Sequence, residues 1–87
     1  MWSMSMITGA QIRSARYALR WSIQELARTS GVSNSTIKRV EVRDGIPPVT
    51  VSNLAAIQSA FEAAGIEFIG SPEDAPGIRV HTRKTED

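Results

Sequence analysis

The sequence has no cysteine, a single histidine, few aromatic residues and no long apolar run. The absence of cysteine excludes disulfides, zinc-thiolate sites, iron-sulfur clusters and thiol catalysis. No apolar stretch approaches the roughly 20 residues that a membrane-spanning helix needs, and the amino-terminal residues lack the basic region of a signal peptide. We therefore expect a cytoplasmic protein with no membrane partner.

Residues typical of an enzyme active site are also scarce. The lone histidine, His81, falls in an expected strand without an acidic cluster near it, so a solvent-facing position suits it better than catalysis. Glu73 and Asp74 form an acidic pair in an expected loop, but they lack the additional oxygen ligands that a metal cation requires. No glycine-rich phosphate-binding loop occurs. We expect no enzymatic activity, no bound metal and no cofactor.

The small net charge hides an uneven distribution along the chain. The 87 residues carry a formal charge of +1, yet the first 44 contain seven basic and three acidic side chains. The remainder contains three basic and six acidic side chains. The basic half can meet a polyanion such as nucleic acid, whereas the acidic half should avoid one. A chain this short forms one domain with a small core, and such a domain gains stability from oligomerisation.

Capping signals and apolar spacing predict four helices in the first 65 residues. Thr8 with Gln11, and Ser22 with Glu25, have the spacing of capping boxes, in which two backbone N–H groups are satisfied reciprocally. Three-four apolar spacing follows each start signal. The expected helices span about 9–20, about 22–29, about 33–42, and a last stretch that starts at Thr50 or Ser52 and is closed by Gly65.

The pattern changes after the helices. Residues 66–69 and 78–82 have β-like composition, and residues 70–77 between them are rich in turn formers, so we expect two strands joined by a loop. A lone two-stranded ribbon is marginal in water and must pack against something. We expect residues 1–7 to be an N-terminal arm and residues 83–87 to be a disordered tail. Trp2, Met4 and Met6 of the arm are expected to be poorly ordered or to cover the core locally, and the alternative is an apolar arm that packs across a partner chain.

The middle of the chain carries a motif with specific spacing. Leu26 and Ala27 precede Gly31, and Ile37 and Glu41 follow at fixed intervals. Two short helices that are joined by a glycine turn, with a small residue where they cross, are typical of a helix-turn-helix. The pattern L-A-x-x-x-G-V-S-x-x-x-I-x-x-x-E, from Leu26 to Glu41, resembles the phage-repressor (lambda repressor and Cro, or XRE) helix-turn-helix family.

This resemblance covers roughly residues 8–64 and implies both a fold and a function. The implied fold is mainly α: a lambda-repressor-like helix-turn-helix domain of four to five helices over 8–65, to which this chain adds a C-terminal two-stranded β extension over 66–82. The implied function is transcription regulation by sequence-specific binding of double-stranded DNA, usually as a homodimer on a palindromic operator. The helix at about 33–42 would read the major groove. The implied DNA-binding residues are Ser33, Asn34, Ser35, Thr36, Lys38, Arg39 and Arg43.

The chemistry of these residues agrees with that function. Asparagine can bind adenine and arginine can bind guanine through two hydrogen bonds each, and serine and threonine hydroxyls suit a base edge or a phosphate. Lys38 and Arg43 suit phosphates. A helix cap is the alternative role for Ser33, and a solvated surface is the alternative for Asn34, Ser35, Lys38 and Arg39.

Two further positions follow from the resemblance. Arg16 and Glu41 fall where the family commonly pairs an arginine of the first helix with a glutamate at the end of the recognition helix, which implies a structural ion pair. Ile23 departs from the family, because many relatives carry a glutamine there that touches a phosphate. Contact between the DNA backbone and Ser22 or Gln24 is therefore an open expectation.

The strands need a separate explanation, because the family core does not require them. We expect a dimer interface in which two chains share a sheet and an apolar seam; its residues are Ile66, Phe68, Ile69, Ile78 and Val80. The alternative is a monomer in which the ribbon folds back on its own fourth helix. An antitoxin-type DNA-binding protein, whose C-terminal segment binds a partner protein, is a further alternative. A protein-interaction module that has lost DNA binding is less compatible with Lys38 and Arg39.

Overall fold

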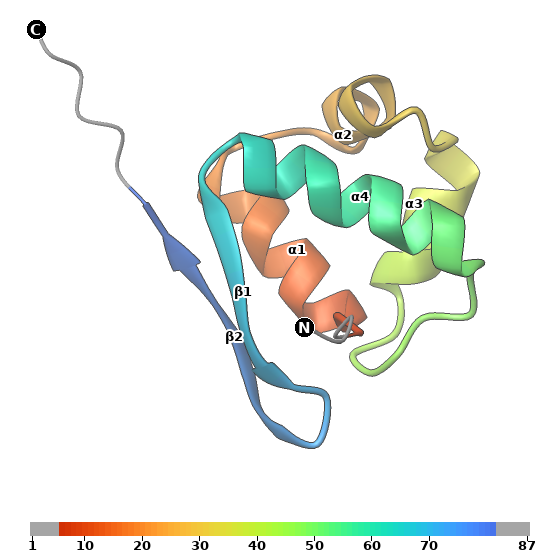
Figure 1. Cartoon of the computed structure of the whole chain (residues 1–87). Helices are drawn as coiled ribbons and strands as arrows, with labels where there is room; N and C mark the ends of the chain where they lie inside the picture. Colours follow the sequence, from red (N-terminus) through yellow and green to blue (C-terminus); the bar gives the residue numbers. More distant parts are fainter. Residues whose placement is uncertain (1–5, 82–87) are drawn as a thin grey trace, which may run out of the picture.

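The computed structural model describes residues 6–81 and contains four helices followed by a two-stranded antiparallel sheet (Figure 1). This is the mainly helical fold with a C-terminal β extension that the sequence predicts. Trp2, Met4, Thr82 and the expected tail at 83–87 lie outside the described residues. The elements are α1 (Gly9–Ala18), α2 (Ile23–Ser30), α3 (Asn34–Glu41), α4 (Val51–Ala63), β1 (Ile66–Ser71) and β2 (Asp74–Val80).

The helices begin at the predicted capping residues. The Thr8 hydroxyl accepts a hydrogen bond from the backbone N–H of Gln11 at 3.1 Å, and the Gln11 side chain accepts from the backbone N–H of Thr8 at 2.8 Å. Ser22 and Glu25 form the same reciprocal pair at the start of α2. Ser33 caps α3, and Thr50, rather than Ser52, caps α4. These local bonds satisfy N–H groups that have no partner within the helix.

The first helix ends two residues earlier than expected. After α1 the backbone N–H of Arg20 donates to the carbonyl of Tyr17, and that of Trp21 donates to the carbonyl of Arg16. This pair of bonds is a Schellman motif, which needs a left-handed residue at the position of Arg20. Arg20 has φ 59°, so the helix stops although no glycine marks its end.

The left-handed conformation of Arg20 predicts that Arg20→Gly stabilises the protein. Glycine avoids most of the steric cost, although its unfolded chain has more freedom, so we expect a gain of about 0.5–1 kcal/mol. Urea unfolding followed by circular dichroism measures it. Ala18→Gly, in the last regular turn of the same helix, is the control and should lose about 1 kcal/mol. A loss of stability in Arg20→Gly would contradict the assignment of strain to this residue.

The core is built from the inner faces of all four helices and the first strand. Phe61 of α4 is fully buried, stacks on Trp21 with ring centroids 5.6 Å apart, and meets Phe68 of β1 edge to face. Trp21 therefore lies at the rim of the core. Ile7, which we assigned to the N-terminal arm, is buried, so the domain begins before Thr8. The buried apolar residues are Ile7, Ile12, Ala15, Leu26, Val32, Ile37, Val40, Leu54, Ile57, Ala60, Phe61 and Ile66.

The two strands are longer than the sequence indicates. Residues 70–77, expected to be a loop, mostly belong to the strands, and Pro72 with Glu73 forms the turn between paired Ser71 and Asp74. The register shifts between Ile69 and Ser71. Gly70 lies between them with φ 77°, and such a β-bulge allows pairing to continue through a stretch rich in turn formers.

The hairpin packs against its own chain rather than standing free (Figure 1). Strand β1 contacts α4 and strand β2 contacts α1. The Gln11 side-chain amide of α1 donates to the carbonyl of Ile69 at 3.1 Å and to that of Gly77 at 2.8 Å. The strands therefore pair within one chain.

Because the hairpin packs on its own domain, only part of the expected dimer interface remains accessible to a second chain. Ile66 is buried, and Phe68 and Ile78 pack against the same core. Ile69 is half-buried, and Val80 is 51% exposed. In this conformation a seam that contains all five residues is not available to a second chain, because three of them already serve the domain's own core.

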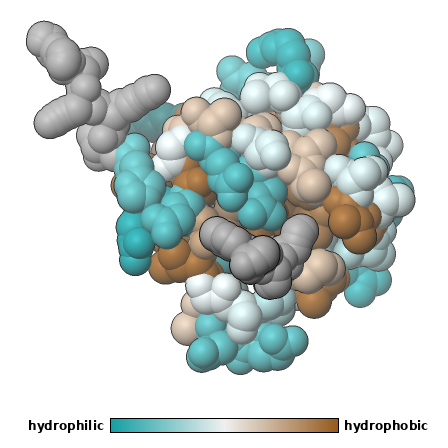
Figure 2. Space-filling model, viewed as in Figure 1, coloured by the Kyte–Doolittle hydropathy of each residue, from teal (hydrophilic) through white to brown (hydrophobic). Residues whose placement is uncertain are grey.

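The surface carries isolated apolar side chains among polar ones. On the face shown in Figure 2, hydrophobic residues appear in separate places rather than as one continuous patch. The large hydrophobic residues that are exposed are Met6, Tyr17, Val42, Ile46, Val51 and Val80. Within residues 6–81, no helix combines the length and the apolar character that crossing a membrane would require.

Candidate nucleic-acid interface

Helix α3 has one buried face and one exposed polar face. Ile37 and Val40 are fully buried, and the side chain of Glu41 is 8% exposed. The side chains of Asn34, Ser35, Lys38 and Arg39 are exposed, as are the cap residue Ser33 and the following Arg43, whereas Thr36 is half-buried. The apolar spacing of three residues turns one face inward. The predicted DNA-binding residues therefore share the outer side of α3 and its two ends.

Ser33 serves as a cap. Its hydroxyl oxygen accepts from the backbone N–H of Thr36 at 3.2 Å and its hydroxyl donates to the Thr36 hydroxyl at 2.9 Å. These bonds use the donor and one of the two acceptor sites of the Ser33 hydroxyl. Ser33 is thus better suited to holding the helix end than to contacting a base.

A tight glycine turn sets α3 against α2. Gly31 ends α2 with φ 79°, and its backbone N–H donates to the carbonyl of Ala27. An added Cβ would have open space there, so the backbone conformation is what favours glycine. Val32 is buried directly after the turn. The predicted glycine turn is therefore present, and it joins two short helices that pack together.

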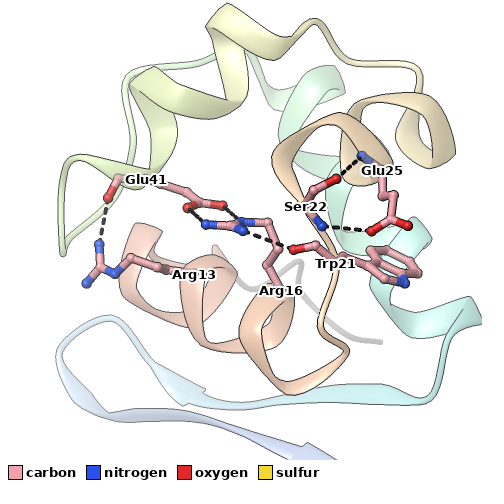
Figure 3. Close-up of polar contacts among 6 residues, drawn as sticks. All are labelled: Arg13, Arg16, Trp21, Ser22, Glu25 and Glu41. Carbon is pink, nitrogen blue, oxygen red and sulfur yellow. Dashed lines mark hydrogen bonds and ion pairs between the residues drawn. The ribbon is translucent and has the colours of Figure 1, made fainter.

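A buried ion pair fixes the end of α3 to α1 (Figure 3). The guanidinium of Arg16 donates to both carboxylate oxygens of Glu41, at 2.7 and 2.8 Å, and to the carbonyl of Trp21 at 3.0 Å. The two side chains are only 10% and 8% exposed. The hydrogen bonds to Glu41 raise the pKa of Arg16 despite its burial. Arg16 thus joins α1, the end of α3 and the segment before α2.

A second arginine of α1, not assigned from the sequence, reaches the same region. Arg13 donates to the backbone carbonyl of Glu41 at 2.6 Å (Figure 3). It also donates to the carboxylate of Asp44, at 2.6 Å. It lies one helical turn before Arg16, and residues three apart share a helix face. That spacing is the signal in the sequence that could have indicated it.

The packing at the start of α2 explains why this chain has Ile23 at a position where the resembled family often has glutamine. The Ile23 side chain is half-buried and packs against the core, so its apolar character serves the domain's stability. Ser22 is exposed but caps α2, and Gln24 is exposed on the same helix. Of the two residues we expected near the DNA backbone, Gln24 has the freer side chain.

The remaining titratable cluster lies on the hairpin. Glu67 pairs with His81 at 2.7 Å and with Arg79 at 3.2 Å, and all three side chains are partly exposed. The hydrogen bond with His81 lowers the pKa of Glu67. His81 is exposed at the end of β2, in keeping with the solvent-facing position we expected for it.

The arrangement of α2 and α3 can be compared with known proteins. It consists of two short helices across a glycine turn, and the second has an exposed face of basic and amide side chains and a buried ion pair with α1. A family model described as helix-turn-helix matches residues 12–62, which is more than half of the chain. The chain belongs to the XRE and lambda-repressor type of helix-turn-helix proteins. It is a DNA-binding transcription regulator of the XRE type.

The family match covers most of the helical region and does not include the hairpin. In this XRE-type protein the matched region runs from the middle of α1 almost to the end of α4, and it includes all of α2 and α3. The hairpin lies beyond it. No curated protein matches the chain.

Proposed function

We propose that the protein regulates transcription in the cytoplasm by binding a specific double-stranded DNA sequence, with α3 in the major groove. The observation that carries this proposal is the outer face of α3, where Asn34, Ser35 and Arg39 are exposed while the opposite face is fixed in the core. Asparagine suits adenine and arginine suits guanine. A rigid helix with such side chains can distinguish base sequences.

Contacts to the DNA backbone would come from the ends of α3. Lys38 and Arg43 are exposed and basic, and the α3 N-terminus adds a partial positive charge. Phosphate contacts position the helix but carry no sequence information. We assign Lys38 and Arg43 to positioning, and Asn34, Ser35 and Arg39 to base recognition.

The salt dependence of binding tests the proposed electrostatic contacts. Each neutralised phosphate contributes about 0.9 to the slope of log affinity against log salt. Two or three such contacts for each bound chain predict that the affinity per chain falls about 10- to 40-fold between about 50 and about 200 mM salt. Fluorescence anisotropy of a labelled duplex measures this. An affinity that does not change over this range would contradict DNA binding through these residues.

We further propose that the protein acts as a homodimer on a palindromic operator. Two-fold symmetry would set the two α3 helices about 34 Å apart, one turn of DNA. Two features support the pairing of a second copy with the hairpin. Within the described residues the sheet has only two strands, so each strand has one unpaired edge, and Val80 is half-exposed at the end of β2. Such edges favour pairing with another chain.

Sedimentation of the whole chain tests this interface. We expect twice the mass of 9.5 kDa for the wild type and a shift toward the monomer for Val80→Asp. A chain that sediments as a monomer both alone and on a palindromic duplex would rule the homodimer out.

A further inference from the structure

The segment that follows α3 is held against the first turn of α1. The backbone N–H of Gly9 donates to the carbonyl of Gly45 at 2.8 Å, and that of Ala10 donates to the carbonyl of Asp44 at 3.3 Å. The first N–H groups of a helix have no partner within the helix, and here two of them bind this segment. Residues 42–45 are therefore fixed to a rigid element rather than free in solvent.

The contact at Gly9 is too close for a side chain. A Cβ built on Gly9 would lie 1.9 Å from the carbonyl oxygen of Arg43 and 2.5 Å from that of Val40. The backbone of Arg43 thus rests directly on the backbone of α1. Its side chain is exposed, so a fixed backbone presents a basic group to solvent.

Arg13 fastens the same segment from both sides of Arg43. One guanidinium nitrogen donates to the carbonyl of Glu41, the last residue of α3, and another contacts the carboxylate of Asp44, each at 2.6 Å. The side chain of Arg13 is one-third exposed, and that of Asp44 is 83% exposed. Arg13 also offsets the negative charge of Asp44, which would otherwise lie beside a basic residue and repel a phosphate.

We infer that Arg13 is a positioning residue, which holds Arg43 ready for a DNA phosphate and makes no contact with the DNA itself. This inference rests on the proposed DNA binding, and it gives a physical reason for part of the affinity. A segment that is already ordered loses less conformational entropy when it binds than a mobile one. The bonds of Arg13 on either side of Arg43 add to the order that the backbone contacts with α1 provide.

A double-mutant cycle between Arg13 and Arg43 tests the inference. The variants are Arg13→Met, Arg43→Ala and the double variant; binding to one selected duplex is measured by anisotropy at several salt concentrations. We expect Arg43→Ala to weaken binding and to reduce the salt slope by about 1 for each bound chain. Arg13→Met should weaken binding about 3- to 10-fold in the wild-type background and less than about 2-fold in the Arg43→Ala background.

Control variants separate this coupling from other effects. Arg20→Met removes an exposed arginine just after α1, outside α3 and the hairpin, and should change affinity by less than about 2-fold at moderate salt. Circular dichroism establishes that each variant is folded at the temperature of the assay. If Arg13→Met does not fold, Arg13→Lys replaces it in the cycle, because lysine keeps the charge and cannot form both bonds in the same geometry.

Three outcomes would overturn the inference. The first is an equal loss of affinity from the Arg13 change in both backgrounds. The second is a further decrease in salt slope when Arg13 is changed in the Arg43→Ala protein, because that would mean a direct phosphate contact by Arg13. The third is no loss from Arg13→Met at all. Failure of the wild-type chain to bind any duplex would instead refute the proposed function.

Discussion

Arg16→Met is expected to lower the free energy of unfolding by about 3–5 kcal/mol, because it leaves the carboxylate of Glu41 buried without its charged partner. Glu41 is 8% exposed and receives two hydrogen bonds from Arg16. Methionine has a similar length and can fill part of the space, so most of the loss is electrostatic rather than a cavity effect. Urea unfolding followed by circular dichroism gives the value.

A second substitution shows whether the unpaired charge is the cause. Arg16→Met combined with Glu41→Leu removes both charges, and buried pairs replaced by apolar residues often recover most of the stability. We expect the double variant to be more stable than Arg16→Met alone. A loss below about 1 kcal/mol for Arg16→Met would mean that the pair contributes no more than a surface ion pair, and α3 would then need another anchor.

The contribution of this ion pair to stability should decrease only at strongly alkaline pH. Glu41 raises the pKa of Arg16, so the contribution of Arg16 to stability is fully present below its pKa in the unfolded chain. It is lost only as the pH rises through the still higher pKa of the folded state. The effect of Arg16→Met should therefore be the same at about pH 7 and about pH 9.

Gly9→Ala is expected to destabilise the domain by about 3 kcal/mol, although alanine is the better helix former by about 1 kcal/mol. The new methyl group would collide with the backbone carbonyls of Arg43 and Val40. Backbone atoms cannot rotate away as the end of a side chain can, so α1 and the segment after α3 must separate. Thermal and urea unfolding measure the loss.

Gly45→Ala is the matched control for this prediction. Gly45 lies in the same contact region, has no positive φ, and has no atom within 4 Å of its would-be Cβ. Its replacement should change stability by less than about 1 kcal/mol and can raise it, because alanine reduces the freedom of the unfolded chain. Equal effects of the two substitutions would contradict the proposed close contact at Gly9.

The helix starts could be predicted because their signals are local. Thr8 with Gln11 and Ser22 with Glu25 are three residues apart, so their spacing in the sequence is sufficient to identify the caps. The end of α1 was less predictable, because Arg20 takes a conformation that usually belongs to glycine. The pairing of Arg16 with Glu41 followed from the family resemblance, since 25 residues separate them.

What the sequence did not indicate depends on contacts between distant segments. The Gln11 side chain has a second role, because its amide group binds the carbonyls of Ile69 and Gly77 and so ties the hairpin to α1. Apolar alternation in the strands predicted a buried face but not whether a second chain or the same chain would cover it. The roles of Gly9 and Arg13 depend on where residues 42–45 lie, which no local pattern encodes.

The central claim is that the outer face of α3 reads a DNA sequence, and selection of bound duplexes from a random pool tests it most directly. The wild type is compared with the double variant Asn34→Ala, Arg39→Ala, whose substituted side chains are exposed and outside the core. We predict that the wild type enriches one shared sequence with two symmetric halves and that the variant does not enrich it. Enrichment of no sequence by the wild type, or equal enrichment of the same sequence by both proteins, would contradict the claim.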